Sequence, residues 1–117
     1  MLRLGRLLLD LVFVVVFAAV GRASHGESVL GTFLTAWPFL VACGVAWIVL
    51  LVMGDEGRGL RAGIIVWLVT VVGGMALRVA AGDTAEVAFI IVATLFLAAT
   101  LLGWRLVAHL LRRRRKA

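Results

Sequence analysis

The sequence predicts an all-α integral membrane protein, a bundle of four transmembrane helices with both termini in the cytoplasm. Of its 117 residues, 64% are apolar and only 15% are charged, whereas ordinary soluble domains carry about 25% charged residues. The apolar residues gather into four stretches, each near the length of about 20 residues that crosses a bilayer as a helix. Ten of the twelve lysines and arginines fall on one predicted face of the bundle.

The first two predicted helices differ in their polar content. The first covers residues 4–21 and carries Asp10, whereas the second covers residues 29–53 without a charged residue. The second also contains the only proline, in the step Trp37-Pro38. Because proline removes a backbone hydrogen bond, we expect a kink there, which either opens a cavity or only shapes the packing.

Short loops lead into the third and fourth predicted helices, over residues 60–81 and 85–109, and a basic tail follows over residues 110–117. Glycines mark the turns, and Asp83 with Glu86 has the spacing of a capping box. Helices joined by such short loops are antiparallel neighbours. We therefore expect residues 1–117 to form a single transmembrane domain.

The basic residues predict the orientation, because lysine and arginine are enriched on the cytoplasmic side of membrane proteins. Only Arg22 and Arg78 fall near the outer face, so we expect one-way insertion into the plasma (inner) membrane. The net charge of +6 is expected to meet anionic lipid headgroups at the basic tail rather than nucleic acid. The residues of the inner face are Arg3, Arg6, Arg58, Arg61, Arg105, Arg112, Arg113, Arg114, Arg115 and Lys116.

The two halves of the sequence resemble each other. A shift of 57 residues aligns Trp47 with Trp104, and a shift of 56 aligns the residues around the outer turns. One interpretation is a parallel repeat of two helical hairpins about a pseudo-twofold axis along the membrane normal. The other is that turn chemistry alone selects similar residues at membrane hairpins. The aligned outer pairs are Arg22 with Arg78, Gly26 with Gly82, Glu27 with Asp83, Ser28 with Thr84 and Phe33 with Phe89.

Ionisable residues inside a span cost about 2.5–3.5 kcal/mol at the helix centre, so each needs a partner or a function. Asp10 and Arg105 are expected at similar depths in the first and fourth helices. They form a cross-helix ion pair, or else Asp10 pairs with Arg6 one turn earlier while Arg105 snorkels to the headgroups.

At the outer face the candidate ligand-site residues are Arg22, His25 and Arg78. Two arginines near the acidic residues of the outer turns would make either an anion or headgroup site, or a set of interfacial salt bridges. His25 either titrates near neutral pH or is a solvated loop residue.

Tryptophans and small residues predict where the helices meet lipid and each other. Trp47, Trp67 and Trp104 fall in the inner halves of their helices, where aromatic belts are expected. Small residues four positions apart predict helix contacts. These pairs are Ala42 with Ala46, Thr70 with Gly74, and Ala99 with Gly103.

Several kinds of chemistry are not expected. A lone cysteine, Cys43, excludes an intramolecular disulfide or a cysteine metal cluster, and His25 and His109 belong to opposite predicted faces, so we expect no metal site and no cofactor. The outer turns contain serine, histidine and aspartate, but they are too short for a nucleophile elbow or an oxyanion hole. The chain is therefore not expected to be an enzyme.

Five separated motifs together resemble a family of small four-helix membrane proteins, mainly actinobacterial, that is catalogued as a domain of unknown function. The resemblance covers nearly the whole chain and implies the membrane fold, without an activity, a cofactor or a catalytic residue. With Asp10, the motifs span residues 21–26, 35–40, 73–78, 93–97 and 103–105.

The sequence leaves two functions open. The first is a non-enzymatic membrane protein that binds or conducts a small solute or ion through Asp10, Arg22, His25, Arg78 and Arg105. The second is an accessory or assembly subunit of a larger membrane complex, because so small a chain has little interior for a pathway. A homodimer would extend the pseudo-twofold symmetry.

Overall fold

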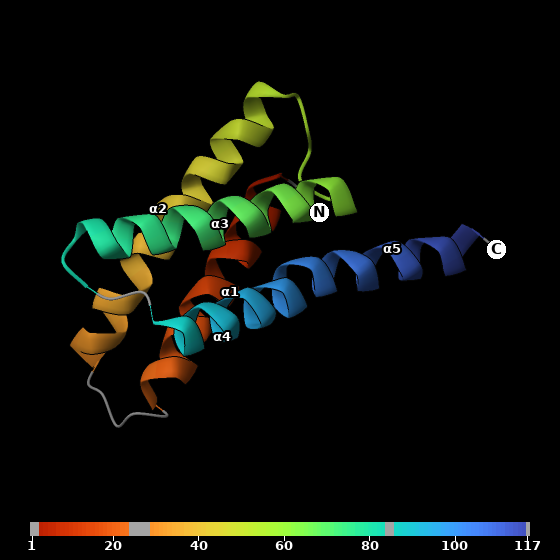
Figure 1. The fold of residues 1–117 in the computed structure, drawn as a ribbon. Coiled ribbons are helices and arrows are strands. Elements are labelled where there is room, and N and C mark those ends of the chain that lie inside the picture. Colours follow the sequence, from red (N-terminus) through yellow and green to blue (C-terminus); the bar gives the residue numbers. More distant parts are fainter. Residues whose placement is uncertain (1–2, 24–28, 84–85, 117) are drawn as a thin grey trace.

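The structure is a computed structural model that describes residues 3–23, 29–83 and 86–116, with side chains over 3–21, 33–83 and 86–114. The described residues form helices and loops and contain no strand, which confirms the predicted all-α fold class. The helices are α1 (Arg3–Ala23), α2 (Val29–Val52), α3 (Leu60–Ala80), α4 (Val87–Leu97), the π-helical turn η1 (Ala98–Leu102) and α5 (Gly103–Lys116) (Figure 1).

Four helical segments of the described chain are long and apolar enough to cross a membrane. Helices α1, α2 and α3 each supply one segment, and α4, η1 and α5 together supply the fourth, from Val87 to Arg114. The chain is therefore built as a multi-pass membrane protein. The last helix continues through the arginines of the expected tail to Lys116.

Helices α2 and α3 end on the same glycine-aspartate sequence. Gly54 and Gly82 have φ values of +73° and +89°, a left-handed conformation that glycine adopts without steric cost. The amides of Asp55 and Asp83 then reach back to the carbonyls of Leu50 and Arg78, at 2.9 and 3.0 Å. This is the Schellman arrangement, which closes a helix by satisfying its last carbonyls.

The start of α4 differs from the capping box expected at Asp83 and Glu86. Glu86 itself occupies the N-cap position, and its side chain makes no capping hydrogen bond. The Asp83 carboxylate lies 3.4 Å from the guanidinium of Arg78. Asp83, which follows α3, thus pairs with Arg78 in the last turn of that helix.

Helix α2 lies between α1 and α3, and α3 runs alongside the rod formed by α4, η1 and α5. Close contact between α2 and α3 depends on glycine, since a Cβ at Gly74 would collide with the ring of Phe39. Phe39 in turn meets Phe17 edge to face, with ring centroids 5.4 Å apart. Buried aromatic and aliphatic side chains of all four segments form one core.

The predicted features of α2 lie in this core. Pro38 is fully buried inside a helix that continues on both sides of it, and Cys43 is a buried core residue. Ala42, Ala46 and Thr70 are buried, and at the contact of α2 with α3 a Cβ at Gly73 would lie 3.1 Å from that of Ala42. Small residues four positions apart thus mark this contact, as predicted.

Three parts of the chain meet at one end of the bundle: the start of α1, the loop between α2 and α3, and α5. We call this the basic end, because Arg6, Arg58 and Arg112 from these three parts line one pocket there. The candidate site lies at this end.

Candidate functional site

Asp10 and Arg105 form an ion pair that is closed off from solvent. The carboxylate of Asp10 on α1 meets the guanidinium of Arg105 on α5 through two parallel hydrogen bonds, Nη1 to Oδ1 at 2.9 Å and Nη2 to Oδ2 at 2.7 Å. Both side chains are 0% exposed. Of the two pairings left open by the sequence, the structure has the cross-helix pair. Arg105 does not snorkel.

Two tryptophans complete the surroundings of the carboxylate. The Nε1 groups of Trp47 and Trp104 donate to Oδ2 and Oδ1 of Asp10 at 2.9 and 2.8 Å. With the two bonds from Arg105, Asp10 accepts four hydrogen bonds, which is about the full capacity of a carboxylate. We call Asp10, Arg105, Trp47 and Trp104 the polar lock.

The guanidinium of Arg105 also holds the loop between α2 and α3. Its Nε donates to the carbonyl of Gly57 at 3.0 Å and its Nη1 to the carbonyl of Leu101 at 2.9 Å. The Gly57 amide donates to the Asp55 carboxylate at 2.8 Å, which fixes the turn. Every nitrogen of the guanidinium therefore has an acceptor, as a buried charge requires.

Glycine makes room for the lock on two sides. A Cβ at Gly63 on α3 would lie 2.8 Å from the Cδ of Arg105. Gly57 has a φ of +80°, and a Cβ there would collide with the ring of Trp47. Both close approaches therefore require glycine.

The π-helical turn η1 aims Arg105 at Asp10. Four fully buried residues of the last span recur at every fourth position: Ala93, Leu97, Leu101 and Arg105. In a regular α-helix, residues four positions apart point in directions that differ by about 40° around the helix axis, because 3.6 residues make a turn. The wider turn at η1 holds an extra residue and so keeps Arg105 on the buried face. The Thr100 hydroxyl donates to the carbonyl of Phe96 at 3.1 Å.

The energetics of this arrangement favour a structural role for the pair itself. Breaking a buried ion pair by removing one partner costs about 3–5 kcal/mol, since the other charge stays buried. The four donors already on Asp10 occupy the lone pairs that an incoming ligand would need. The lock therefore joins α1, α2 and α5 and holds its residues in fixed positions.

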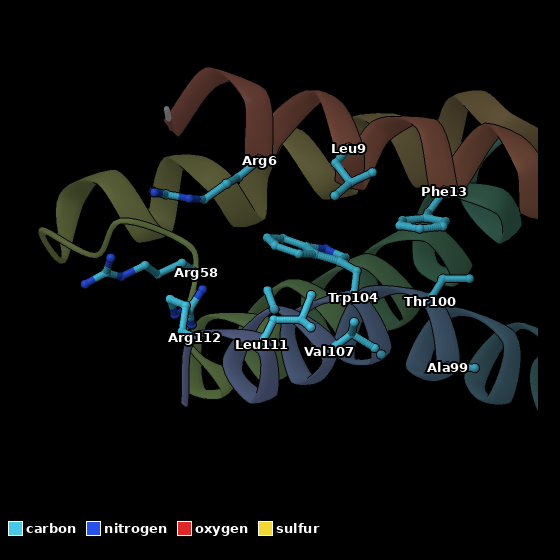
Figure 2. Close-up of a pocket in the computed structure, with 12 residues that line it drawn as sticks. Arg6, Leu9, Phe13, Arg58, Ala99, Thr100, Trp104, Val107, Leu111 and Arg112 are labelled. Carbon is cyan, nitrogen blue, oxygen red and sulfur yellow. The ribbon is translucent and has the colours of Figure 1, made fainter. Parts of the chain in front are cut away.

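An open groove of about 660 Å³ lies directly beside the lock, between α1 and α5. Trp104 stands in its middle, with its indole facing α1 (Figure 2). Leu9 and Phe13 line the α1 side, and Val107 and Leu111 line the α5 side. The volume lies within the range of about 300–1,000 Å³ typical of ligand sites.

The two ends of the groove differ in character. Arg6, Arg58 and Arg112 gather at one end, whereas Phe13, Ala99 and Thr100 lie toward the other (Figure 2). Ala99 is exposed and Gly103 lines the same groove. These two small residues thus border an opening within the described chain, where a helix contact was predicted.

Two arginines at the groove, Arg6 and Arg58, interact with Glu56 in the loop between α2 and α3. Arg6 Nη1 donates to the carbonyl of Glu56 at 2.8 Å, and Arg58 Nε lies 3.7 Å from the Glu56 carboxylate, both side chains being more than half exposed. An exposed ion pair of this kind contributes little stability. Arg58 can therefore exchange Glu56 for a ligand at small cost.

The candidate residues at the opposite end lie apart from the lock. Arg78 is mostly buried, pairs with Asp83, and stacks over Phe89 with 4.3 Å from Cζ to the ring centroid. This is the arrangement expected of an interfacial salt bridge. Arg22 belongs to α1 but its side chain is outside the described residues, as is His25 altogether.

No group of three potential metal ligands occurs among the described residues. His109 is an exposed residue of α5.

Sequence reasoning missed the roles of Trp47, Trp104 and Gly57. The two tryptophans were expected in an aromatic belt at the lipid interface, but Trp47 is 3% exposed and both donate to Asp10. A signal was present, since the two tryptophans align at the repeat shift and lie near the expected depth of Asp10. Nothing in the sequence marked Gly57 apart from the other loop glycines.

A family model described as "Protein of unknown function (DUF3054)" matches residues 7–108. This range includes all four residues of the polar lock. Comparisons with curated proteins and with solved structures gave no match.

Proposed function

The chain belongs to this family of proteins of unknown function, so its function has to be inferred from the geometry of the site. We propose that it is a non-enzymatic membrane protein that binds a small anionic solute or ion at its basic end. The observation that carries the proposal is the groove beside Trp104, with Arg6, Arg58 and Arg112 at one end. The proposed binding site therefore lies next to the lock and not inside it.

Binding is favoured over conduction by the state of the buried pair. A solute that crossed the bundle through Asp10 would have to separate this carboxylate from Arg105 and two indoles. That separation would leave two buried charges without partners, at a cost of several kcal/mol. A ligand in the groove leaves all of these bonds intact.

We also propose that the basic end faces the cytoplasm, in the plasma membrane. Support comes from the positive-inside rule, since ten of the twelve lysines and arginines were assigned to this face. Maleimide labelling tests the orientation with a cysteine placed at Arg113 in a Cys43→Ala background. An impermeant reagent added to intact cells should leave that cysteine unlabelled, and labelling from outside would reverse the assignment.

The internal repeat stays a proposal too. Its support is the shared role of Trp47 and Trp104, which align at a shift of 57 residues and donate to the two oxygens of one carboxylate. A duplicated hairpin would give both copies a tryptophan at that depth.

Calorimetric titration of the purified chain in neutral detergent tests anion binding, with inorganic phosphate and hexyl phosphate as probes. We expect saturable binding of at least one probe, weakened about tenfold or more in Arg6→Gln/Arg112→Gln, since each cation is worth about 1 kcal/mol. The matched control is Arg113→Gln/Arg114→Gln, which removes the same charge from exposed positions outside the groove. Absent binding, or equal loss in both variants, would contradict the proposal.

A role as an accessory or assembly subunit is the second candidate. The observation in its favour is that only 17% of the apolar segment of 18 residues in the fourth span is buried, against 50% of the corresponding segment in the second span. A partner helix would cover this exposed apolar surface. Cross-linking in native membranes, through a photoreactive residue at the exposed Leu95, should then yield one defined heterologous adduct. The control is the photoreactive residue placed at Val45, which is exposed on α2, and it should not yield that adduct.

A further inference from the structure

Resting on the proposed anion-binding function, we propose that the ligand of the groove is an anionic phospholipid, with its phosphate at Arg6, Arg58 and Arg112 and one acyl chain along Trp104 toward Ala99. The shape and polarity of the groove indicate this class of ligand.

The groove is amphiphilic along its length. Its three arginines gather at one end, and the rest of its lining is almost entirely apolar (Figure 2). A soluble anion would use only the arginine end and leave the apolar part without a function. A phospholipid fits both parts, because a headgroup phosphate and an acyl chain are covalently joined in the same order.

The length of the groove fits one leaflet of a bilayer. From Arg112 to Ala99 the last span rises by about 20 Å, at 1.5 Å per residue. Half of a hydrocarbon core measures about 15 Å, which leaves about 5 Å for the phosphate at the arginines. The groove is also open to the outside of the molecule, and both helices that border it belong to candidate membrane spans. A lipid can therefore enter laterally from the bilayer.

The charges select an anionic headgroup. Arginine binds phosphate through its planar fork of N–H donors, and the groove is lined by three arginines and by no acidic residue of the described chain. A zwitterionic choline headgroup would bring a cation into this surplus of positive charge. The preference should therefore be for a headgroup with net negative charge.

Native mass spectrometry of the purified full chain tests the assignment, with phosphatidylglycerol and phosphatidylcholine of identical acyl chains as probes. We expect phosphatidylglycerol to be retained at least about tenfold more tightly. The variant Arg6→Gln/Arg58→Gln/Arg112→Gln should lose this preference. The control Arg61→Gln/Arg113→Gln/Arg114→Gln, which removes three exposed arginines outside the groove lining, should keep it.

A second variant tests the acyl part without changing charge. A Cβ at Gly103 would meet nothing within 4 Å, so Gly103→Leu should fold, which circular dichroism checks, and its side chain would fill the groove. This variant should bind both lipids more weakly and should still prefer phosphatidylglycerol to phosphatidylcholine. Unchanged lipid retention in Gly103→Leu would overturn the assignment.

The remaining outcomes separate this inference from the function on which it rests. If the groove variant keeps the preference for phosphatidylglycerol, or the control loses it equally, the lipid assignment is wrong. If hexyl phosphate binds in the groove while phosphatidylglycerol does not, the assignment fails and anion binding stands. If Gly103→Leu instead breaks a dimer of the wild-type chain, a second copy occupies the groove and the lipid assignment is wrong.

Discussion

At the scale of single residues, Asp10 is the point on which the basic end converges. Its two oxygens accept one indole N–H each, from Trp47 and Trp104, in addition to the guanidinium of Arg105. Hydrogen bonds to an ionised group are stronger than those between neutral groups. The tryptophans here act chiefly as donors to a buried charge, which sets them apart from tryptophans at a lipid interface.

Phenylalanine at these positions tests that role. Trp47→Phe and Trp104→Phe should each lower the free energy of unfolding by about 1.5–3 kcal/mol, the worth of a hydrogen bond to a charged group. The matched control is Trp67→Phe, because Trp67 donates to the neutral carbonyl of Thr94 at 3.0 Å. Its loss should cost only about 0.5–1.5 kcal/mol. Detergent-mediated unfolding followed by circular dichroism measures all three, and equal losses would contradict the assigned role.

The sequence shows how far single residues can be predicted. The sequence left two pairings open for Asp10, with Arg105 or with Arg6. It predicts that Asp10 and Arg105 lie at similar depths in the membrane, but it does not predict the rotation of each helix about its axis. The missing rotation comes from η1, whose extra residue is invisible to any regular helical pattern. Gly57 could not be identified either, since its contacts with Trp47 and Arg105 depend on how the loop folds back.

At the scale of elements, the loop between α2 and α3 depends on two glycines with different constraints. Gly54 and Gly57 both have positive φ, but only a Cβ at Gly57 would meet another residue, the ring of Trp47. Comparing alanine at the two positions separates backbone strain from collision.

We expect Gly54→Ala to cost about 1–2 kcal/mol, from the left-handed conformation alone. Gly57→Ala should cost about 1–3 kcal/mol more, because Trp47 must move and its bond to Asp10 is lost. The difference between their unfolding free energies is the measured quantity. Equal costs would show that the loop adapts without disturbing Trp47.

The turn η1 makes a prediction about deletions. Because it holds one residue more than a regular turn, removal of the exposed Ala99 should convert it to α-helix and leave Arg105 facing Asp10. Removal of the exposed Ile91 from α4 should be far more damaging, since α4 has no extra residue and its first turn would rotate by about 100°. That rotation would pull Phe89 away from Phe17, where their ring centroids lie 5.8 Å apart.

The yield of folded protein after purification and its unfolding midpoint distinguish the two deletions. If both are equally damaging, η1 does not act as a one-residue insertion.

At the scale of the whole molecule, the four membrane segments followed directly from composition. Runs of apolar residues of the required length predict spans without any tertiary information, and the structure confirms four. The groove was not predictable in this way. It lies between α1 and α5 beside Trp104, and the separation of two helices is set by their packing and not by a local sequence pattern.

The central claim is that one buried ion pair ties the first helix to the last and so builds the basic end. A double-mutant cycle of Asp10→Asn and Arg105→Met, measured as unfolding free energy of the purified chain, tests it most directly. Each single variant should lose about 3–5 kcal/mol. The double variant should lose less than the sum of the two by about 2–3 kcal/mol, because neither charge is then left buried alone. Strictly additive losses would mean that Asp10 and Arg105 do not interact, and would contradict the account.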